Sequence, residues 1–225
     1  VSVNQGYTPA VLELPGELPP GEHVLWQGAP DWRTLHRYAF HGRALVAYFA
    51  IMLGLRAIVV LGGGGSPAEA AIAVAWLLPA VVFALGVIAT VAWLTARSTG
   101  YTVTNRRVVM RIGIVLEVVF NFPFAVVEAA GLHRFGNGCG DLALRLAAGQ
   151  QIGYAHLWPH ARPWHLRRPE PMLRCIPDAV RVAELLARAL AGETGGNALP
   201  IREAAQGAAP AAGTSKGQVA AGAAG

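Results

Sequence analysis

The sequence predicts an α+β membrane protein, in which a two-helix transmembrane hairpin precedes a small antiparallel β-sheet or barrel with a C-terminal α-helix. The composition is the first indication. Of the 225 residues, 54% are hydrophobic and only 14% are charged, whereas a soluble domain carries about 25% charged residues. The second indication is a pair of long apolar runs in the first half of the chain. Short β-rich runs separated by turn residues then fill much of the second half.

The segment before the apolar runs divides into two parts. Residues 1–22 are rich in Pro, Gly and Glu, and we expect them to form a flexible arm. Residues 23–43 begin within EHVLWQGAPDW, which predicts a short cytoplasmic strand and turn. The first 26 residues contain neither a basic n-region nor an apolar h-region, so a cleavable signal peptide is not expected.

Residues 44–96 predict the transmembrane hairpin. The first run is uncharged over residues 44–55 and continues beyond Arg56 to residue 61, whereas the second is uncharged over residues 70–96. About 20 apolar residues span a bilayer core. Arg56 lies near the end of its run, where it can snorkel to the headgroups; a charge on a transport path is the alternative. Pro79 allows a kink in the second helix.

Basic residues predict the orientation of this hairpin. They flank it on both sides, whereas the Gly-rich tip contains Glu69 and no Lys or Arg. The positive-inside rule therefore places both termini in the cytoplasm, as in a multi-pass protein of a bacterial inner membrane. The flanking basic residues are Arg33, Arg37, Arg43, Arg97, Arg106, Arg107 and Arg111.

Residues 97–192 predict a domain of short strands and one helix. YTVTNRRVVMRIG places a Thr-Asn turn between two β-rich runs, and strands are also expected in IVLEVVFNFPF, DLALRLA and IGYAHLW. The amphipathic PDAVRVAELLARALAG predicts the closing helix. This order is the layout of a pleckstrin-homology (PH)-like domain. Residues 193–225 are mostly Ala and Gly, and we expect them to be disordered.

The titratable residues indicate no catalytic centre. The sequence contains no HExxH, GxSxG or P-loop motif, and we expect no enzymatic activity. His156, His160 and His165 are four and five residues apart, but two prolines exclude a regular helix there, so no metal site is expected. Cys139 and Cys175 form no CxxC pair and are expected to be free thiols.

A net charge of +5 favours an anionic neighbour. Because the chain contains two membrane runs, we expect membrane lipids and no nucleic acid. Arg106 and Arg107, at the Thr-Asn turn, are candidate contacts for lipid phosphate. They are equally consistent with a solvated face or with the positive-inside set. Gly and Ala in the hairpin would also allow the helices of two copies to approach closely, so a homodimer is physically allowed.

The stretch LWPHARPWHLRRPEPMLRC, residues 157–175, predicts a surface that binds a partner protein. Trp and Arg are enriched in interface hot spots, and Pro lowers the ordering cost of binding. In the alternative interpretation, the Trp residues cap the barrel and the Arg residues face anionic headgroups; for Trp158 the two interpretations are nearly equal. The candidate partner-binding residues are Trp158, His160, Arg162, Trp164, Arg167 and Arg168.

Several of these motifs also resemble a known family. LPPGEHVLWQGAPDWRTL, YTVTNRRVVMRIG and GDLAL, together with two transmembrane helices, resemble membrane-anchored bacterial PH domains. APDWRTLHRYAFHGRALVAYF and LWPHARPWHLRRPEPMLRCIPDA resemble, more narrowly, the PuhB-type photosynthetic complex assembly proteins of purple bacteria, which are encoded beside the reaction-centre H subunit. The resemblance covers residues 15–190 and excludes the tail.

This resemblance implies a non-catalytic assembly factor for the photosynthetic reaction centre and its light-harvesting core complex, in the inner (intracytoplasmic) membrane. The factor would bind nascent subunits, with the H subunit as a candidate partner. The resemblance also implies transient handling of bacteriochlorophyll, whose magnesium is usually held by a His; His41 is close enough to the interface to serve, or is an ordinary interfacial residue. A general PH module that binds lipid or envelope proteins and a pigment carrier are the alternatives.

Overall fold

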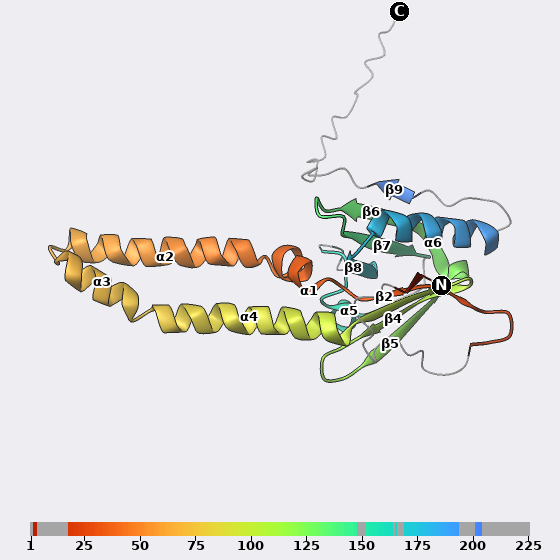
Figure 1. The fold of residues 1–225 in the computed structure, drawn as a ribbon, viewed down its shortest axis with the longest axis horizontal. Coiled ribbons are helices and arrows are strands. Elements are labelled where there is room, and N and C mark those ends of the chain that lie inside the picture. Colours follow the sequence, from red (N-terminus) through yellow and green to blue (C-terminus); the bar gives the residue numbers. More distant parts are fainter. Residues whose placement is uncertain are drawn as a thin grey trace, which may run out of the picture.

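The computed structural model describes residues 2–3, 18–147, 152–163, 165, 169–193 and 201–203. Figure 1 shows a pair of long helices that project from one end of a β-rich domain. We call that end of the domain the hairpin end and the opposite end the distal end. The predicted tail and arm fall largely outside the described residues, as do 148–151.

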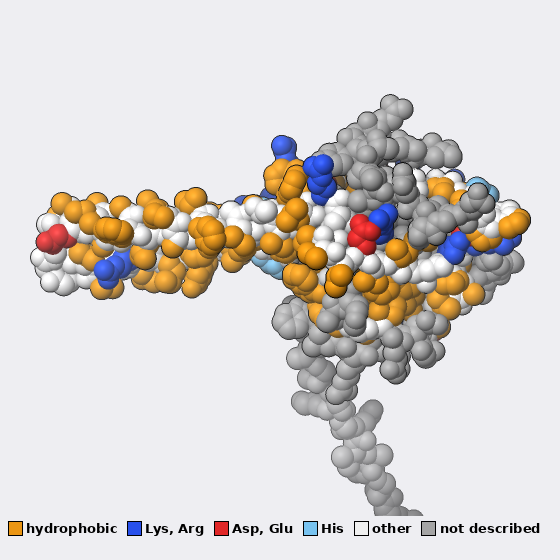
Figure 2. Space-filling model, turned by 90° about the horizontal axis from the view of Figure 1, so that it is seen from below, with side chains coloured by type: hydrophobic (Ala, Val, Ile, Leu, Met, Phe, Trp, Pro, Cys, Tyr) orange, Lys and Arg blue, Asp and Glu red, His pale blue; other side chains and the backbone are white. Residues whose placement is uncertain are grey.

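Two segments are long and apolar enough to cross a membrane, Gly42–Gly62 and Pro67–Ser98. The first is α2 (Gly42–Gly62), and the second contains α3 (Pro67–Ala75) and α4 (Leu78–Ser98). Figure 2 shows apolar side chains along the hairpin. Arg43 and Arg97 lie where the two helices meet the domain, and Arg56 and Glu69 are the charged residues between them. The lengths and composition of the helices therefore agree with the predicted hairpin.

The second apolar segment is broken at Trp76 and Leu77 instead of being one kinked helix. Pro79 lies in the first turn of α4. Its ring has no N–H to donate and would clash with the carbonyl four residues earlier, so a helix can begin at this residue but does not run through it. At the tip, Ser66 and Glu69 form a reciprocal capping box that begins α3.

The first sheet has the order β1-β2-β3-β4-β5. Its strands are β1 (Ser2–Val3), β2 (Val24–Gly28), β3 (Gly100–Thr104), β4 (Arg107–Ile112) and β5 (Val118–Pro123). β2 precedes the hairpin and β3 follows it, yet the two pair in antiparallel fashion, with Gly28 opposite Tyr101. The hairpin is therefore inserted within the sheet. Residues 24–28, which the sequence analysis set apart from residues 97–192, form a strand of the same domain.

The second sheet has the order β8-β7-β6-β9. It consists of β6 (Val127–Arg134), β7 (Gly140–Leu146), β8 (Met172–Ile176) and β9 (Ile201–Glu203), and the 3-10 turn η3 (Phe124–Val126) joins it to β5. The described strands form two sheets and no closed barrel, which corrects the barrel alternative. The predicted C-terminal helix is confirmed as α6 (Ala179–Glu193). It contacts β6 and β7, and its Leu186 and Leu190 are fully buried in the core.

The strand expected in IGYAHLW is wrong, because Tyr154–Leu157 forms a short helix, α5. Both edges of β7 are already occupied, by β6 and β8, so this segment has no edge of β7 to join. Leu157 is instead fully buried at the end of α5. The chain after α5 then runs beside the start of β8, where Ala161 forms an isolated antiparallel bridge with Pro171. The Arg162 N–H donates to the Glu170 carbonyl, and the Met172 N–H donates to the His160 carbonyl.

The direction of each strand determines whether the loop after it lies at the hairpin end or at the distal end of the domain. β3 begins directly after α4 and runs away from the hairpin, and β4 returns. β6 and β8 also run toward the hairpin, because Phe135 and Cys175 contact the segment that leads into α2. Loops 113–117 and 135–139 therefore lie at the hairpin end, whereas the turn at Asn105 and Arg106 lies at the distal end (Figure 1).

An ion pair between Arg107 and Glu22 joins the distal turn to the segment that precedes β2. Arg107 donates from Nε and Nη2 to the two carboxylate oxygens of Glu22, at 2.6 and 2.8 Å. The Glu22 side chain is 3% exposed. Burial alone would raise the pKa of Glu22, but the hydrogen bonds from Arg107 and Thr104 and the nearby positive charge lower it overall. The end of the predicted flexible arm is therefore held against the sheet.

We expect Glu22→Gln to lower the free energy of unfolding by about 1–3 kcal/mol, because an amide cannot replace two charged acceptors. Denaturant unfolding of the full chain in mild detergent, followed by Trp fluorescence, would measure it. The loss should shrink as the pH falls below about 4.5, because the Glu22 carboxylate of the unfolded chain is protonated there before that of the folded chain. The control is Arg106→Ala, at an exposed neighbour; an equal loss in the control would contradict the role of the ion pair.

Candidate functional site

The helices join the domain through a short, well-packed segment at the hairpin end. It consists of α1 (Trp32–Thr34) and the π-helical turn η2 (Leu35–Ala39). The Asp31 carboxylate accepts from the Thr34 N–H at 2.9 Å, and the Asp31 N–H donates to the Cys175 carbonyl at 2.9 Å. Tyr38 stacks on Phe135, with ring centroids 4.1 Å apart. These contacts hold the segment before α2 on the second sheet.

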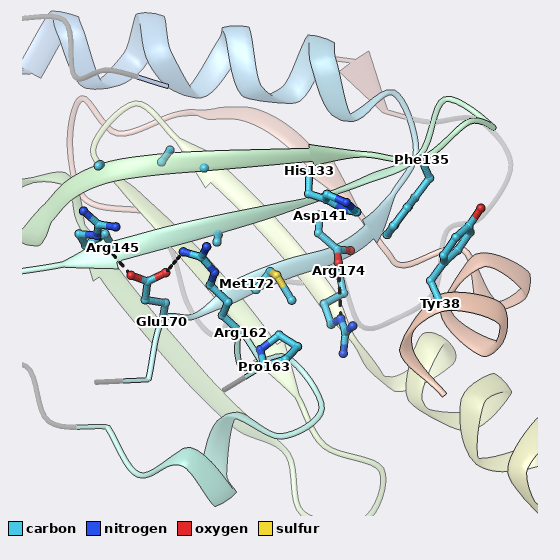
Figure 3. A pocket seen from close by; sticks show the side chains of 14 residues that line it. Tyr38, His133, Phe135, Asp141, Arg145, Arg162, Pro163, Glu170, Met172 and Arg174 are labelled. Carbon is cyan, nitrogen blue, oxygen red and sulfur yellow. Dashed lines mark hydrogen bonds and ion pairs between the residues drawn. The ribbon is translucent and has the colours of Figure 1, made fainter. Parts of the chain in front are cut away.

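A pocket of about 600 Å³ lies over the second sheet and reaches this joint. Figure 3 shows Tyr38 and Phe135 at one end and the Arg145, Glu170 and Arg162 side chains at the other. Its lining results from the two-residue period of β7. Leu142 and Leu144 point into the core, whereas Asp141, Ala143 and Arg145 face the pocket. Arg162 and Pro163, from the loop after α5, form another part of the lining.

At the distal end of the pocket, Glu170 is shared between two arginines. Its carboxylate accepts from Arg162 Nη1 at 2.7 Å and from Arg145 Nε at 3.2 Å. Burial alone would raise the pKa of Glu170, but the hydrogen bonds from Arg162 and Arg145 and the Arg162 charge lower it overall. The side chains of Arg145 and Arg162 are 52% and 38% exposed, so this cluster presents positive charge to the solvent side of the pocket.

A second charged pair lies deeper in the pocket. Arg174 Nε is 3.9 Å from Asp141 Oδ2, and Arg174 Nη1 donates to the Pro159 carbonyl at 2.9 Å. The Arg174 Nε is buried and has no hydrogen-bond partner. Burial raises the pKa of Asp141, although Arg174 and the Cys175 N–H oppose that rise. The pair therefore offers an incompletely satisfied cation at the floor of an otherwise largely apolar pocket.

The prediction that His160 forms part of a partner-binding surface is wrong, because its ring is fully buried. The Tyr101 hydroxyl accepts from the Arg174 N–H at 3.1 Å and forms a second hydrogen bond with His160 Nδ1 at 2.7 Å. The other ring nitrogen, Nε2, forms a hydrogen bond with Thr99 Oγ1 at 3.1 Å. Burial and the Arg174 charge lower the pKa of His160 to about 3. The ring is therefore a neutral structural residue.

The remaining predicted partner-binding residues are divided. Trp158 is 56% exposed, and its ring contacts Phe40 edge to face at 6.2 Å. Arg162 lines the pocket. Trp164, Arg167 and Arg168 lie outside the described residues. The structure therefore brings Arg162 to the pocket. It places Trp158 at the hairpin end of the domain, beside Phe40, which precedes α2.

The two arginines predicted to contact lipid phosphate lie at the distal end of the domain. Arg107 is engaged by Glu22, and Arg106 lies beside Gly21. A bilayer around the hairpin would lie at the other end of the domain, so both arginines would face away from it, and their contact with lipid stays a prediction that this arrangement does not favour. His41 does lie at the hairpin end, where it is exposed in a left-handed conformation (φ 53°) before α2. Its contact with a pigment stays a prediction.

Sequence reasoning missed most of the residues that form the pocket. Asp141, Arg145 and Arg174 are charged residues within otherwise apolar strands, and the alternation in DLALRL places the first two on one face. That pattern was the available signal. Tyr38 and Glu170 had no comparable signal, because tertiary contacts bring them to the site. Among the described residues, no group of three His, Cys, Asp or Glu could hold a metal ion.

Comparisons with known proteins agree with this architecture. The profile of the family described as Bacterial PH domain matches residues 44–190. A protein of Rhodobacter capsulatus, named as an uncharacterized 23.7 kDa protein in the puhA 5' region, is 40% identical over 178 residues. The alignment covers 78% of this chain and 83% of that relative. No solved structure gives a significant match.

The hydroxyl of Tyr101 should be a stabilising group of the site. Tyr101→Phe would leave His160 Nδ1 and the Arg174 N–H buried without their partner, and we expect the free energy of unfolding to fall by about 1–3 kcal/mol. Tyr38→Phe is the matched control, because it keeps the ring that stacks on Phe135. Denaturant unfolding would measure both variants, and equal stability of Tyr101→Phe and wild type would contradict the network.

The buried neutral His160 should make stability depend on pH. Its pKa in the unfolded chain is near 6.5 and its folded pKa is about 3, so the unfolded state gains a proton first as the pH falls. This contribution is present above pH 6.5 and should decrease by about 2 kcal/mol between pH 7 and pH 5. Unfolding of wild type and His160→Gln at both values would test this, and an identical pH dependence in both would contradict it.

Proposed function

Since the chain belongs to the bacterial PH domain family, we propose that it is a membrane-anchored, non-catalytic assembly factor for the photosynthetic reaction centre and its light-harvesting core complex. The single observation that carries the photosynthetic role is the 40% identity to the Rhodobacter capsulatus protein of the puhA 5' region. The gene puhA is that of the reaction-centre H subunit, so the name of the relative associates it with the region of that gene.

The hairpin is the proposed membrane anchor, with both termini on the cytoplasmic side. Positive charge gathers where the helices enter the domain, as the positive-inside rule requires of a cytoplasmic surface. Three of these guanidinium groups lie over aromatic rings at 5.2–5.6 Å, which suits an interface between headgroups and water. The pairs are Arg33 with Trp32, Arg37 with Tyr38, and Arg97 with Trp93.

The pocket is the proposed site for a partner polypeptide. It begins at Tyr38, directly before α2, so a subunit anchored in the same membrane could present its membrane-adjacent cytoplasmic segment there. The lining contains Arg145, Arg162 and Arg174 against two carboxylates, Asp141 and Glu170, so acidic side chains are favoured. The apolar wall would bury an aliphatic or aromatic neighbour. The H subunit is the candidate partner, and assembly requires binding without a chemical step.

Partner capture should depend on the pocket and not on surface charge in general. We expect Arg162→Ala to reduce about tenfold the amount of reaction-centre subunits that co-purify with the tagged protein, as for a residue that contributes about 1.4 kcal/mol to binding. Ala129→Phe, which fills the pocket without removing a charge, should have the same effect. The control is Arg188→Ala, which removes one positive charge from α6, away from the pocket.

The measurement is a mild-detergent pull-down of tagged protein from pigmented membranes, read by mass spectrometry and by near-infrared absorbance. Reaction-centre subunits captured by wild type and by Arg188→Ala, but not by the pocket variants, would support the proposal. Capture of lipids and unrelated envelope proteins alone would indicate a general PH module. Pigment without reaction-centre subunits would indicate a pigment carrier.

A further inference from the structure

The loop between β4 and β5 exposes three consecutive apolar side chains. Ile114, Val115 and Leu116, which we call the apolar tip, are 44%, 88% and 81% exposed. Single exposed apolar residues are ordinary on protein surfaces, but the tip of a turn is usually built from Gly, Pro, Asn, Asp or Ser. Val118 and Val119 extend the apolar surface into β5, at 37% and 40% exposure. Three apolar residues at a tip therefore require a neighbour.

The shape of the loop directs these side chains away from the domain. Gly113 has a φ of 131°, and a Cβ at this position would collide with the Leu116 carbonyl group. Arg111 and Glu117 close the base of the loop through an ion pair, in which Arg111 Nε lies 3.1 Å from the Glu117 carboxylate. The turn is thus closed locally by groups of its own, and its apolar residues do not fold back over the sheet.

The loop lies at the hairpin end, beside α4. Gly100, two residues after α4, pairs with Arg111, and β4 continues beyond it. Figure 1 shows the turn between β4 and β5 next to the end of α4. A strand rises by about 3.3 Å per residue, so the tip extends roughly 5–10 Å past Gly100, alongside the last turns of α4. Trp93 and Arg97, which stack at 5.2 Å, lie in those turns.

The neighbours of the tip identify its occupant. Trp and Arg at the end of a membrane helix mark the headgroup level of a bilayer. The tip reaches that level from the domain side, and the apolar surface of α4 lies next to it. The charged pair at the base of the loop would lie among the headgroups while the tip lies among the first acyl carbons. A phospholipid bilayer fits this arrangement of an apolar tip with a polar base.

We propose that the apolar tip inserts into the bilayer interface beside α4, as a membrane contact separate from the two helices. The proposal rests on the membrane anchoring of the proposed function and goes beyond it. The two helices can tilt in the bilayer and carry the joined domain with them, whereas a third contact to one side of them restricts that tilt. The tip would thereby hold the pocket at a constant height and angle to the membrane surface.

Nitroxide labels on single cysteines would test the insertion. Val115→Cys reports the tip, Val82→Cys reports an exposed position in the middle of the apolar segment Pro67–Ser98, and Arg106→Cys reports the distal turn. The unsubstituted chain is the labelling control, because Cys139 and Cys175 are both buried. Each full-length labelled chain is placed in phosphatidylcholine–phosphatidylglycerol vesicles. Relaxation of the nitroxide by oxygen, which partitions into lipid, is compared with relaxation by water-soluble nickel-EDDA.

At position 115 we expect an oxygen-to-nickel ratio several-fold higher than at position 106, and closer to that at position 82. Adding Leu116→Asp to the Val115→Cys chain should lower the ratio toward that at position 106. A water-like ratio at 115 with a lipid-like ratio at 82 would overturn the inserted tip and leave the anchor intact. Shielding of position 115 from both reagents would also overturn it, in favour of a protein contact. Water-like ratios at both 82 and 115 would overturn the tip and the anchor together.

Discussion

The antiparallel pairing of β2 with β3 is the constraint on which the rest of the structure depends. The two strands are separated in sequence by the whole helical hairpin, and they can pair only because the hairpin returns the chain to its starting point. This pairing makes the two helices an insertion within a sheet and not an appendage before a domain. Asp31 and Tyr38 bind the segment before α2 to the second sheet, through Cys175 and Phe135. Movements of the helices and the domain are therefore coupled.

The buried hydrogen-bond network around His160 also joins the end of α4 to the two sheets. Thr99 follows α4, Tyr101 belongs to β3, and Arg174 belongs to β8. The ring is held as a neutral group between them, and the loop that contributes Arg162 to the pocket is thereby attached to the end of α4. A polar residue that seemed suited to an external partner instead supports the site. The residues that face outward, Arg162 and Trp158, depend on its position.

The pocket and the apolar tip belong to the same domain, so the tilt of the domain relative to a membrane fixes the positions of both. The pocket reaches the joint before α2, and the tip lies beside the end of α4. A partner anchored in the same bilayer meets the pocket only if the domain keeps a defined tilt. The membrane contact and the partner contact would therefore act together, since the first reduces the orientational freedom that binding must otherwise restrict.

The sequence by itself determined the elements whose signals are local. Apolar length identified the hairpin, a 3.6-residue period identified α6, and the turn residues identified β3 and β4, because each signal lies within a few neighbouring residues. Only the tertiary structure decided that β2 belongs to the first sheet, that His160 points inward, and that Arg106 and Arg107 lie far from the hairpin. Those outcomes depend on strand pairing and direction between distant segments. The stretch of residues 157–175 contributes Arg162, Glu170 and Arg174 to the pocket, but its local composition could not distinguish a buried His from an exposed one.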